Sequence, residues 1–191
     1  MPKDYDPAVT APNAQRRREN ALDDAATRAL IAQLEIGHIA TVWGQQPFIN
    51  PTTFWYDPAA HAIYFHSNVV GRMRANSEHH ARVCFEASRY GRFLPSNIAL
   101  EFSVQYESVV AYGDIRLLEA PNEKRHALAG LIAKYFPKMR AGHEYRPITD
   151  QELKRTSVYA LSIESWSGKR NWAEQADQSD EWAPLGTEWL A

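Results

Sequence analysis

The sequence lacks several features that identify common classes of protein. It has one cysteine among 191 residues, Cys84, so no internal disulfide can form. Cys84 stands in the apolar run ARVCFEA, which favours a buried thiol over a nucleophile. No apolar run approaches the roughly 20 residues that cross a bilayer, and the N-terminus contains no apolar signal segment. We therefore expect a soluble, cytoplasmic protein.

Common ligand-binding and catalytic motifs are missing as well. The chain contains no G-x-G-x-x-G loop, no G-x-x-x-x-G-K-S/T loop and no G-x-S-x-G nucleophile motif. Its seven histidines are scattered and give no zinc pattern, so no metal site is predicted. The formal net charge of −2 gives no reason to expect a nucleic acid or a membrane as partner.

Hydrophobic periodicity predicts a small barrel. Alternating patterns indicate six strands, and apolar residues at helical spacing indicate helices between and after them. Because the strands do not alternate with long helices, the pattern favours mainly antiparallel β structure with flanking helices, of the α+β class, over a parallel sheet. The strands are expected at 38–43, 48–56, 61–67, 81–88, 103–119 (with a bend or bulge at Gly113) and 157–166, and the helices at 22–34, 70–79 and 121–136.

The two ends of the chain differ from the middle. Residues 1–19 contain three prolines and the basic run Arg16–Arg18, and we expect an extended arm whose cations are solvated. Residues 20–172 are expected to form one folded domain. Residues 173–191 form an acidic, Trp-containing tail, and no Lys or Arg occurs in 171–191. Because tryptophans are poorly placed in solvent, we expect this tail to dock on its own barrel or on a partner subunit.

The stretch YFHSNVVGRMRAN (64–76) is a candidate phosphate site. It passes from a predicted strand through Gly71 and Arg72 into a predicted helix, whose first N–H groups would be unpaired. The Arg72 guanidinium could bind a phosphate through two parallel hydrogen bonds. Arg74 would face away from Arg72 by roughly 200° on a helix. From spacing alone, a turn with solvated arginines is the simpler interpretation.

Two further stretches could meet a ligand. In SWSGKRNW, Lys169 and Arg170 lie beside Trp172 and could close over an anionic, planar molecule. In INPTTFWY, Pro51 lacks an N–H, and Thr52 and Thr53 could offer hydroxyl and backbone groups. An exposed turn and an ordinary strand are the alternatives.

In their order and spacing, these segments resemble the FMN-binding split-barrel proteins related to pyridoxamine 5′-phosphate oxidase, and most of all the branch of the Nim-type nitroimidazole reductases. The resemblance covers roughly residues 20–172, and no single motif is diagnostic. The segments that carry it are GHIATV (37–42), PFINPTTFWYD (47–57), IYFHSNVVGRMRAN (63–76), ARVCFEAS (81–88), YESVVAYGDIRLLE (106–119), NEKRHALAGLIAKY (122–135) and IESWSGKRNW (163–172).

The resemblance implies a six-stranded split barrel that forms a homodimer with FMN at the subunit interface. A first set of residues would run beside the isoalloxazine ring, namely Asn50, Pro51, Thr52, Thr53 and Phe54. A second would hold the ribityl chain and phosphate, namely Phe65, His66, Ser67, Gly71 and Arg72. A third would reach the flavin from the partner chain or line the rim, namely Tyr106, Ser108, Lys169, Arg170 and Trp172. Met73 stands where many family members carry a second cation, which Arg74 or a partner cation could replace.

The function implied is an FMN-dependent oxidoreductase that passes electrons from NAD(P)H to a small organic acceptor. His66 could donate a proton or only hydrogen-bond the cofactor. Pyridoxamine phosphate oxidation is not predicted, because the Arg- and His-bearing C-terminal motif of the true oxidases is missing and the tail is acidic. The alternatives are a flavin- or haem-binding module without turnover, with His38, His66 or His126 as haem ligand, and a barrel that has lost its ligand.

Overall fold

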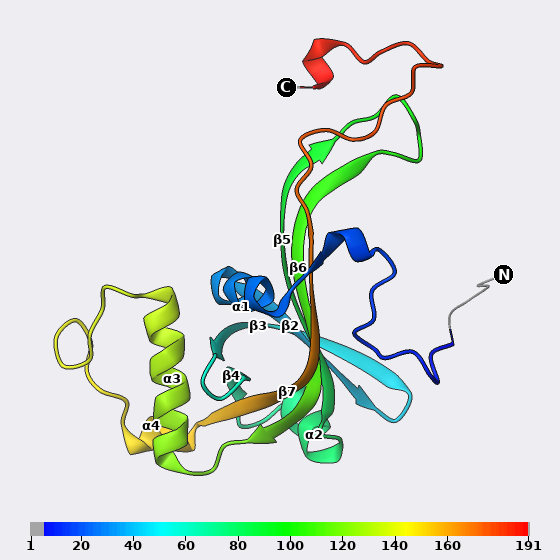
Figure 1. The fold of residues 1–191 in the computed structure, drawn as a ribbon. Helices are drawn as coiled ribbons and strands as arrows, with labels where there is room; N and C mark the ends of the chain where they lie inside the picture. Colours follow the sequence, from blue (N-terminus) through cyan, green and yellow to red (C-terminus); the bar gives the residue numbers. More distant parts are fainter. Residues whose placement is uncertain (1–5, 191) are drawn as a thin grey trace.

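Six antiparallel strands close into a barrel in this computed structural model, which describes residues 6–190. The strands are β2 (Ile36–Trp43), β3 (Gln46–Asp57), β4 (Ala62–Asn68), β5 (Arg82–Leu94), β6 (Ser103–Leu117) and β7 (Thr156–Asn171). Their order is β7, β4, β3, β2, β5 and β6, and β6 pairs with β7 to complete the circuit. This arrangement confirms the predicted fold class (Figure 1).

Helices flank the barrel where the chain leaves one strand and enters the next. They are α1 (Asp24–Gln33), α2 (Arg72–His79), α3 (Pro121–Tyr135) and α4 (Asp150–Lys154), with single 3-10 turns at η1 (Arg18–Asn20) and η2 (Thr187–Trp189). The Asp23 carboxylate caps α1 by accepting a hydrogen bond from Ala26 N at 2.7 Å. Helix α4 is absent from the predicted elements, although Thr149 and Glu152 form a reciprocal capping box at its start.

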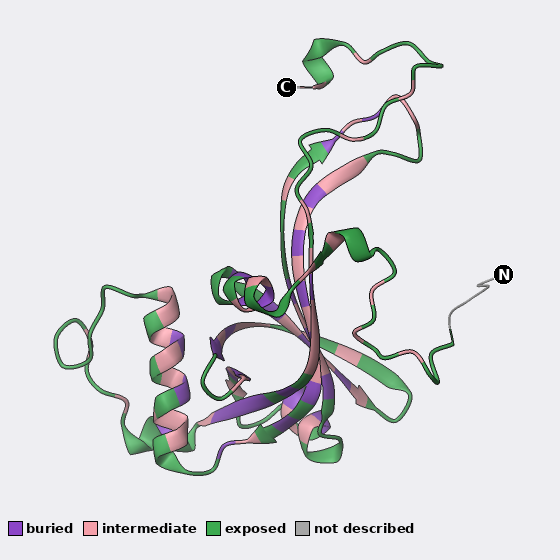
Figure 2. Ribbon diagram, in the orientation of Figure 1, coloured by how far each residue is buried: buried purple, intermediate pink, exposed green. Residues whose placement is uncertain are grey.

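The core fills the inside of the barrel with one face of each strand. Phe54 and Phe85 meet edge to face, and Phe65 stacks on Tyr159 with ring centroids 4.9 Å apart. A smaller cluster lies between α3 and the strands behind it and includes Ala127 and Val158. Figure 2 shows buried segments gathered within the barrel and continuing along β6 into the arm, while the far end of β5 is mostly exposed. Burial therefore stabilises the barrel itself more than its projections.

The register between β6 and β7 shifts at the predicted bend. Tyr112 pairs with Ser165 but Gly113 pairs with Ile163, so Glu164 is an extra residue on β7. A Cβ atom at Gly113 would lie 1.9 Å from the Ser162 carbonyl oxygen, which explains the glycine. The predicted bend or bulge at Gly113 is confirmed.

Beyond the barrel, β5, β6 and β7 continue as a three-stranded arm (Figure 1). The C-terminal tail packs along the tip of this arm within the same chain, where Ser96 Oγ donates to Asp177 O at 2.6 Å and Asn97 Nδ2 donates to Ser179 O at 2.9 Å. Trp182 and Trp189 nevertheless remain 71% and 64% exposed. Tail docking therefore does not bury these two side chains within one chain.

A short strand near the N-terminus pairs with β7. This two-residue strand, β1 (Ala21–Leu22), is absent from the predicted elements. Residues 1–5 of the predicted arm lie outside the described residues, and the division into 1–19, 20–172 and 173–191 stays a prediction. Within residues 6–190, no helix combines the length and apolarity needed to cross a membrane.

Helix α3 is tied to the barrel by its last turn. The Tyr135 hydroxyl accepts a hydrogen bond from Phe54 N at 3.0 Å and donates to the Glu35 carbonyl. Next to it, Lys134 Nζ donates to Leu34 O at 2.6 Å and lies 3.5 Å from the centre of the Phe54 ring. Burial lowers the pKa of Lys134 from 10.5 to about 8. These two side chains therefore hold the start of β2 and the middle of β3 together.

We predict that Tyr135→Phe lowers the free energy of unfolding by about 1–3 kcal/mol, because Phe54 N–H and the Glu35 carbonyl lose a partner. Urea denaturation measures the change. The control is Tyr90→Phe, since Tyr90 is exposed and its hydroxyl has no hydrogen bond in the described residues; it should change the stability little. Equal stability of Tyr135→Phe and the native chain would contradict the role given to this hydroxyl.

Candidate functional site

The barrel opens between β3 and β4. These strands pair from Asp57 and Ala62 only as far as Phe54 and Phe65. Beyond that point β3 stays paired with β2 down to Gln46, whereas β4 stays paired with β7 up to Asn68. Two strand segments, 46–53 and 66–68, therefore diverge and leave a split in the sheet. We call this opening the β3–β4 split.

The β3 side of the split carries the predicted residues Asn50 to Thr53. Asn50 Nδ2 donates to Pro51 O at 3.3 Å, and Thr52 Oγ1 donates to Thr53 O at 3.0 Å. Pro51 is exposed and the other three are partly exposed, so all four can meet a ligand. Phe54 follows them, but its ring is fully buried in the core and it can offer only backbone groups.

The β4 side of the split carries His66 and Ser67. Phe65, which precedes them, is fully buried, so its side chain is part of the core. His66 points outward and lines a groove of about 480 Å³, mostly apolar, whose other residues include Leu128, Leu131 and Ile148. Although part of the ring is open to solvent, the surrounding protein desolvates it and lowers the pKa of His66 below its ordinary value of 6.5. Desolvation therefore favours the neutral form of His66.

The start of α2 supplies the predicted phosphate-binding residues. Gly71 precedes the helix with φ of +136°, a conformation that favours glycine, and no side chain caps the first N–H groups. Arg72 is exposed and has no ion pair in the described part of the chain. Met73 is buried in the core, so no second cation stands there. Arg74 is paired with Glu78 in the next turn of the helix.

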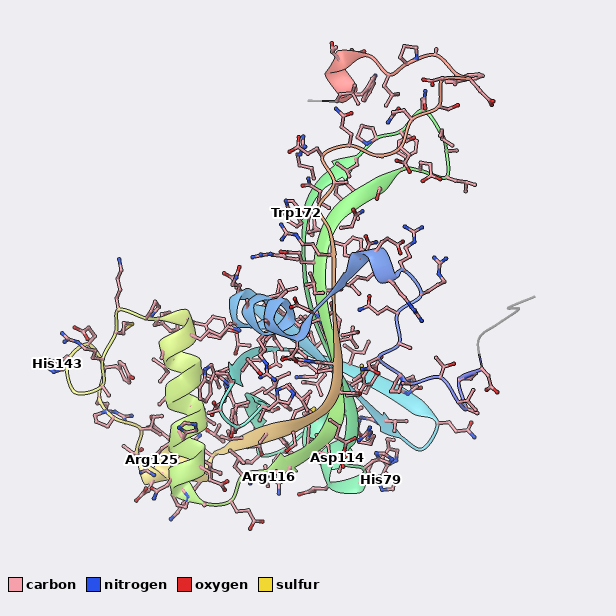
Figure 3. All side chains as sticks on the ribbon, in the orientation of Figure 1. His79, Asp114, Arg116, Arg125, His143 and Trp172 are labelled. Atoms are coloured by element: carbon pink, nitrogen blue, oxygen red, sulfur yellow. The ribbon has the colours of Figure 1, made fainter. Side chains whose placement is uncertain are left out.

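The remaining predicted residues lie elsewhere in the chain. Tyr106, Ser108 and Lys169 line a pocket of about 420 Å³ on β6 and β7, and Arg170 is paired with Glu107. Figure 1 shows α2 at the lower end of the barrel and the arm above it, and Figure 3 labels Trp172 on that arm. The predicted residues of one chain therefore fall into two groups. One lies at the β3–β4 split and the start of α2, and the other, on β6 and β7, is not brought to the split within the same chain.

Some residues of these two regions were not predicted as site residues. Lys134 and Tyr135 hydrogen-bond backbone groups beside the split. The sequence gives one signal for this pair, the helical apolar face that contains Tyr135. Gln15, Arg16 and Arg17 line the pocket on β6 and β7, and their signal is the basic run. Among residues 6–190, no group of three or more His, Cys, Asp or Glu side chains could hold a metal ion.

Comparisons with known proteins agree with this fold. A family model described as pyridoxamine 5′-phosphate oxidase matches residues 23–170. A flavocytochrome from Azotobacter vinelandii is similar in structure, with a TM-score of 0.77, 23% identity and coverage of 88% of this chain and 76% of the other. An FAD and haem binding protein from Mycobacterium smegmatis has a TM-score of 0.74 and 21% identity, with coverage of 83% of this chain and 76% of the other. A candidate 5-nitroimidazole antibiotic resistance protein from Bacteroides thetaiotaomicron has a TM-score of 0.66 and 20% identity, with coverage of 78% of this chain and 86% of the other. No curated protein matches the sequence.

The lowered pKa of His66 predicts a pH-dependent stability. Between its folded pKa and 6.5 the unfolded chain binds more protons than the folded chain, so the contribution of His66 to stability rises with pH and is constant above 6.5. The test compares the free energy of unfolding of the native chain with that of His66→Gln. The difference, native minus variant, should increase from pH 5 to about 6.5 and then level off.

His143→Gln is the control, because Figure 3 shows His143 on the outer loop after α3. Chemical denaturation at each pH gives both differences. The same pH dependence in both variants, or none in His66→Gln, would contradict the desolvation of His66.

Proposed function

This chain belongs to the pyridoxamine 5′-phosphate oxidase family, and from that premise we propose that it binds FMN in the β3–β4 split and is an oxidoreductase. Electrons would pass from NAD(P)H through bound FMN to a small organic acceptor. The observation that carries this proposal is the split itself. Its two sides bear polar groups and it lies beside an uncapped helix start.

The residues at the split fit the parts of FMN. The N–H groups at the start of α2 and the unpaired Arg72 guanidinium suit a phosphate dianion, because both are donors and both favour negative charge. Ser67 and His66 could hydrogen-bond the ribityl chain. Asn50, Thr52 and Thr53 would lie beside the ring system. Bound flavin would supply the redox chemistry, and the chain would supply position and polarity.

The groove beside His66 is the proposed place for the acceptor. Leucine and isoleucine side chains dominate its wall, so it favours an apolar molecule. A neutral His66 can donate one ring N–H to the acceptor and accept a hydrogen bond at the other nitrogen. Arg146, which also lines the groove, is neutralised by Glu152 at 2.7 Å, so the groove offers no free cation to a phosphorylated substrate.

We propose further that the active form is a homodimer. The sequence resemblance assigns Tyr106 and Ser108 to the flavin of the partner chain, and within one chain both lie on the arm, outside the split. A second chain could bring its arm to the split of the first. The exposed aromatic residues of the arm, Tyr90 and Phe93, suit such an interface.

Arg72→Ala should weaken FMN binding by about 10- to 100-fold, because a charge-assisted hydrogen bond to the phosphate is lost. Fluorescence titration of the apoprotein measures the affinity, and the rise in melting temperature with added FMN provides a second readout. The control is Arg155→Ala, which removes another exposed arginine without an ion pair in the described residues. Unchanged affinity in Arg72→Ala, or a colourless native protein that FMN does not stabilise, would refute the proposal.

A flavin- and haem-binding module without turnover is the second candidate. Two of the structures similar to this chain are a flavocytochrome and an FAD and haem binding protein. Of the three histidines predicted as possible haem ligands, His38 lies 3.0 Å from Glu86 and His126 lies 3.2 Å from Asp57. His66 has no polar partner in the described residues and lines the apolar groove, where a haem could sit.

This second candidate predicts that adding haem to the protein gives a Soret band that is lost in His66→Ala and kept in His38→Ala. Absorption spectroscopy of the titrated protein decides the matter. Rapid reoxidation of NADPH-reduced protein by an organic acceptor, with no haem bound, would favour the oxidoreductase.

A further inference from the structure

A cluster of five polar and aromatic side chains joins α1 to the barrel, and the proposed function does not use it. It lies at the turn between β3 and β4, which is the end of this strand pair away from the β3–β4 split. Figure 1 shows α1 beside the barrel, near the base of the arm. We call this group the α1 cluster, and its members are Asp24, Arg28, Tyr56, His61 and Trp166.

Hydrogen bonds and a ring contact connect the cluster in a circuit. One Asp24 carboxylate oxygen accepts from Trp166 Nε1 at 3.0 Å, and the other accepts from Arg28 Nε at 2.7 Å. Arg28 Nη1 donates to the Tyr56 hydroxyl at 2.5 Å, and this hydroxyl lies 2.9 Å from His61 Nδ1. The His61 ring meets the Trp166 ring edge to face, with centroids 4.7 Å apart. The first turns of α1 are therefore fixed to β3 and β7 by side chains.

The donors around His61 determine its protonation state. A guanidinium has only donors, so the Tyr56 oxygen accepts from Arg28, and the hydroxyl proton is left for His61 Nδ1. Arg28 Nη1 also lies 3.4 Å from the same nitrogen. Nδ1 is therefore an acceptor without a proton. The ring carries its proton on Nε2 and is neutral.

A proton on Nδ1 is incompatible with this arrangement. The new N–H group would face the Tyr56 hydroxyl proton, so the hydrogen bond between them would be lost. It would also place a second positive charge beside the Arg28 guanidinium. Burial, followed by the charge of Arg28, accordingly lowers the pKa of His61 below its ordinary value of 6.5.

The acidic groups around the cluster do not compensate for this effect. On α1, Asp24 favours the charged form of His61, but burial and Arg28 outweigh it. The Asp57 carboxylate on β3 and the Glu164 carboxylate on β7 each pair with another side chain. Protonation of His61 therefore leaves two neighbouring cations with one carboxylate between α1 and the barrel.

The backbone of His61 is also held in one conformation. Its φ of +47° lies in the left-handed region, which is uncommon for a residue with a side chain. Ile163 N donates to His61 O at 3.2 Å, beside the bulge in β7. The turn therefore presents the ring to Tyr56 and Arg28 from a fixed position.

We propose that the α1 cluster is an acid-sensitive latch. While His61 is neutral, the circuit holds the first turns of α1 on the barrel. When His61 gains a proton, the circuit opens and these turns loosen. Residues 6–22 lead directly into α1 and lie along β7 through Asn13, Gln15 and β1, so the end of this segment loosens with them. The latch requires no flavin, and its test is independent of the proposed function.

His61→Asn tests the latch. The asparagine oxygen can accept a hydrogen bond in place of Nδ1, the side chain does not titrate, and asparagine adopts positive φ more readily than most residues. Below pH 6.5, the unfolded native chain binds more protons than the folded chain. The folded-to-unfolded ratio of the native chain should therefore fall relative to His61→Asn, by at most about tenfold per pH unit, and stay constant above pH 6.5.

Urea denaturation from pH 5 to 8 measures this ratio. Because both chains carry His66, its contribution cancels. His143→Asn is the control, since His143 is exposed on the loop after α3, and it should keep the native pH dependence (Figure 3).

Hydrogen exchange locates the part of the chain that loosens. Between pH 7 and 5.5, the protection factors of α1 amides should fall several-fold in the native chain and stay constant in His61→Asn. Those of α3 should fall less in the native chain, because α3 lies outside the latch. Equal losses in α1 and α3 would overturn the latch, because they would report unfolding of the whole domain.

Nitrogen NMR of the native protein tests the latch without any variant. At pH 7 the His61 ring should carry its proton on Nε2, and it should titrate below 6.5. A proton on Nδ1 at pH 7, titration at or above 6.5, or the same pH dependence of stability in the native chain and His61→Asn would overturn the proposal.

Discussion

The pairing of β3 with β4 ends at the Phe54–Phe65 pair. Beyond it, β3 pairs only with β2 and β4 pairs only with β7. A split in a closed sheet leaves backbone groups without a strand partner, and these need other donors and acceptors. Tyr135 supplies one at Phe54, and side chains of Asn50 and Thr52 supply others. Because the rest of the circuit is closed through β6 and β7, the opening stays in one place. A rigid frame with one gap is the physical basis of the proposed site.

Much of the fold could be predicted because each barrel strand has one buried and one exposed face. Alternation locates all six strands and apolar spacing locates α1 and α3. The start of β6 in the arm was predicted, since its burial alternates there, but the far end of β5 was not, because residues 88–93 are mostly exposed, as Tyr90 and Phe93 show. Helix α4 is too short for a periodic signal, and its capping box is the only local clue.

The arrangement of the candidate site could be predicted where its residues are neighbours in sequence. Ser67, Gly71 and Arg72 lie together because a strand end and a helix start are joined directly. Phe65 and Met73, within the same stretch, prove to be core residues, because the resemblance marks a segment and not the direction of each side chain. The contacts of Asn13 and Gln15 with β7 join residues 153 positions apart, and no local pattern reports such contacts.

The bulge at Glu164 has a consequence for the chemistry of the arm. Lys169 lines the pocket on β6 and β7, while Arg170 pairs with Glu107 on the other face. Residues directly opposite each other in a sheet share a face, and the bulge absorbs Glu164 while Lys169 stays opposite Ser108 and Arg170 opposite Glu107. A slip of one residue in the pairing of β6 with β7 would instead exchange the faces of Lys169 and Arg170. The register of these two strands, with no change of sequence, therefore sets which cation faces the pocket and which faces the carboxylate.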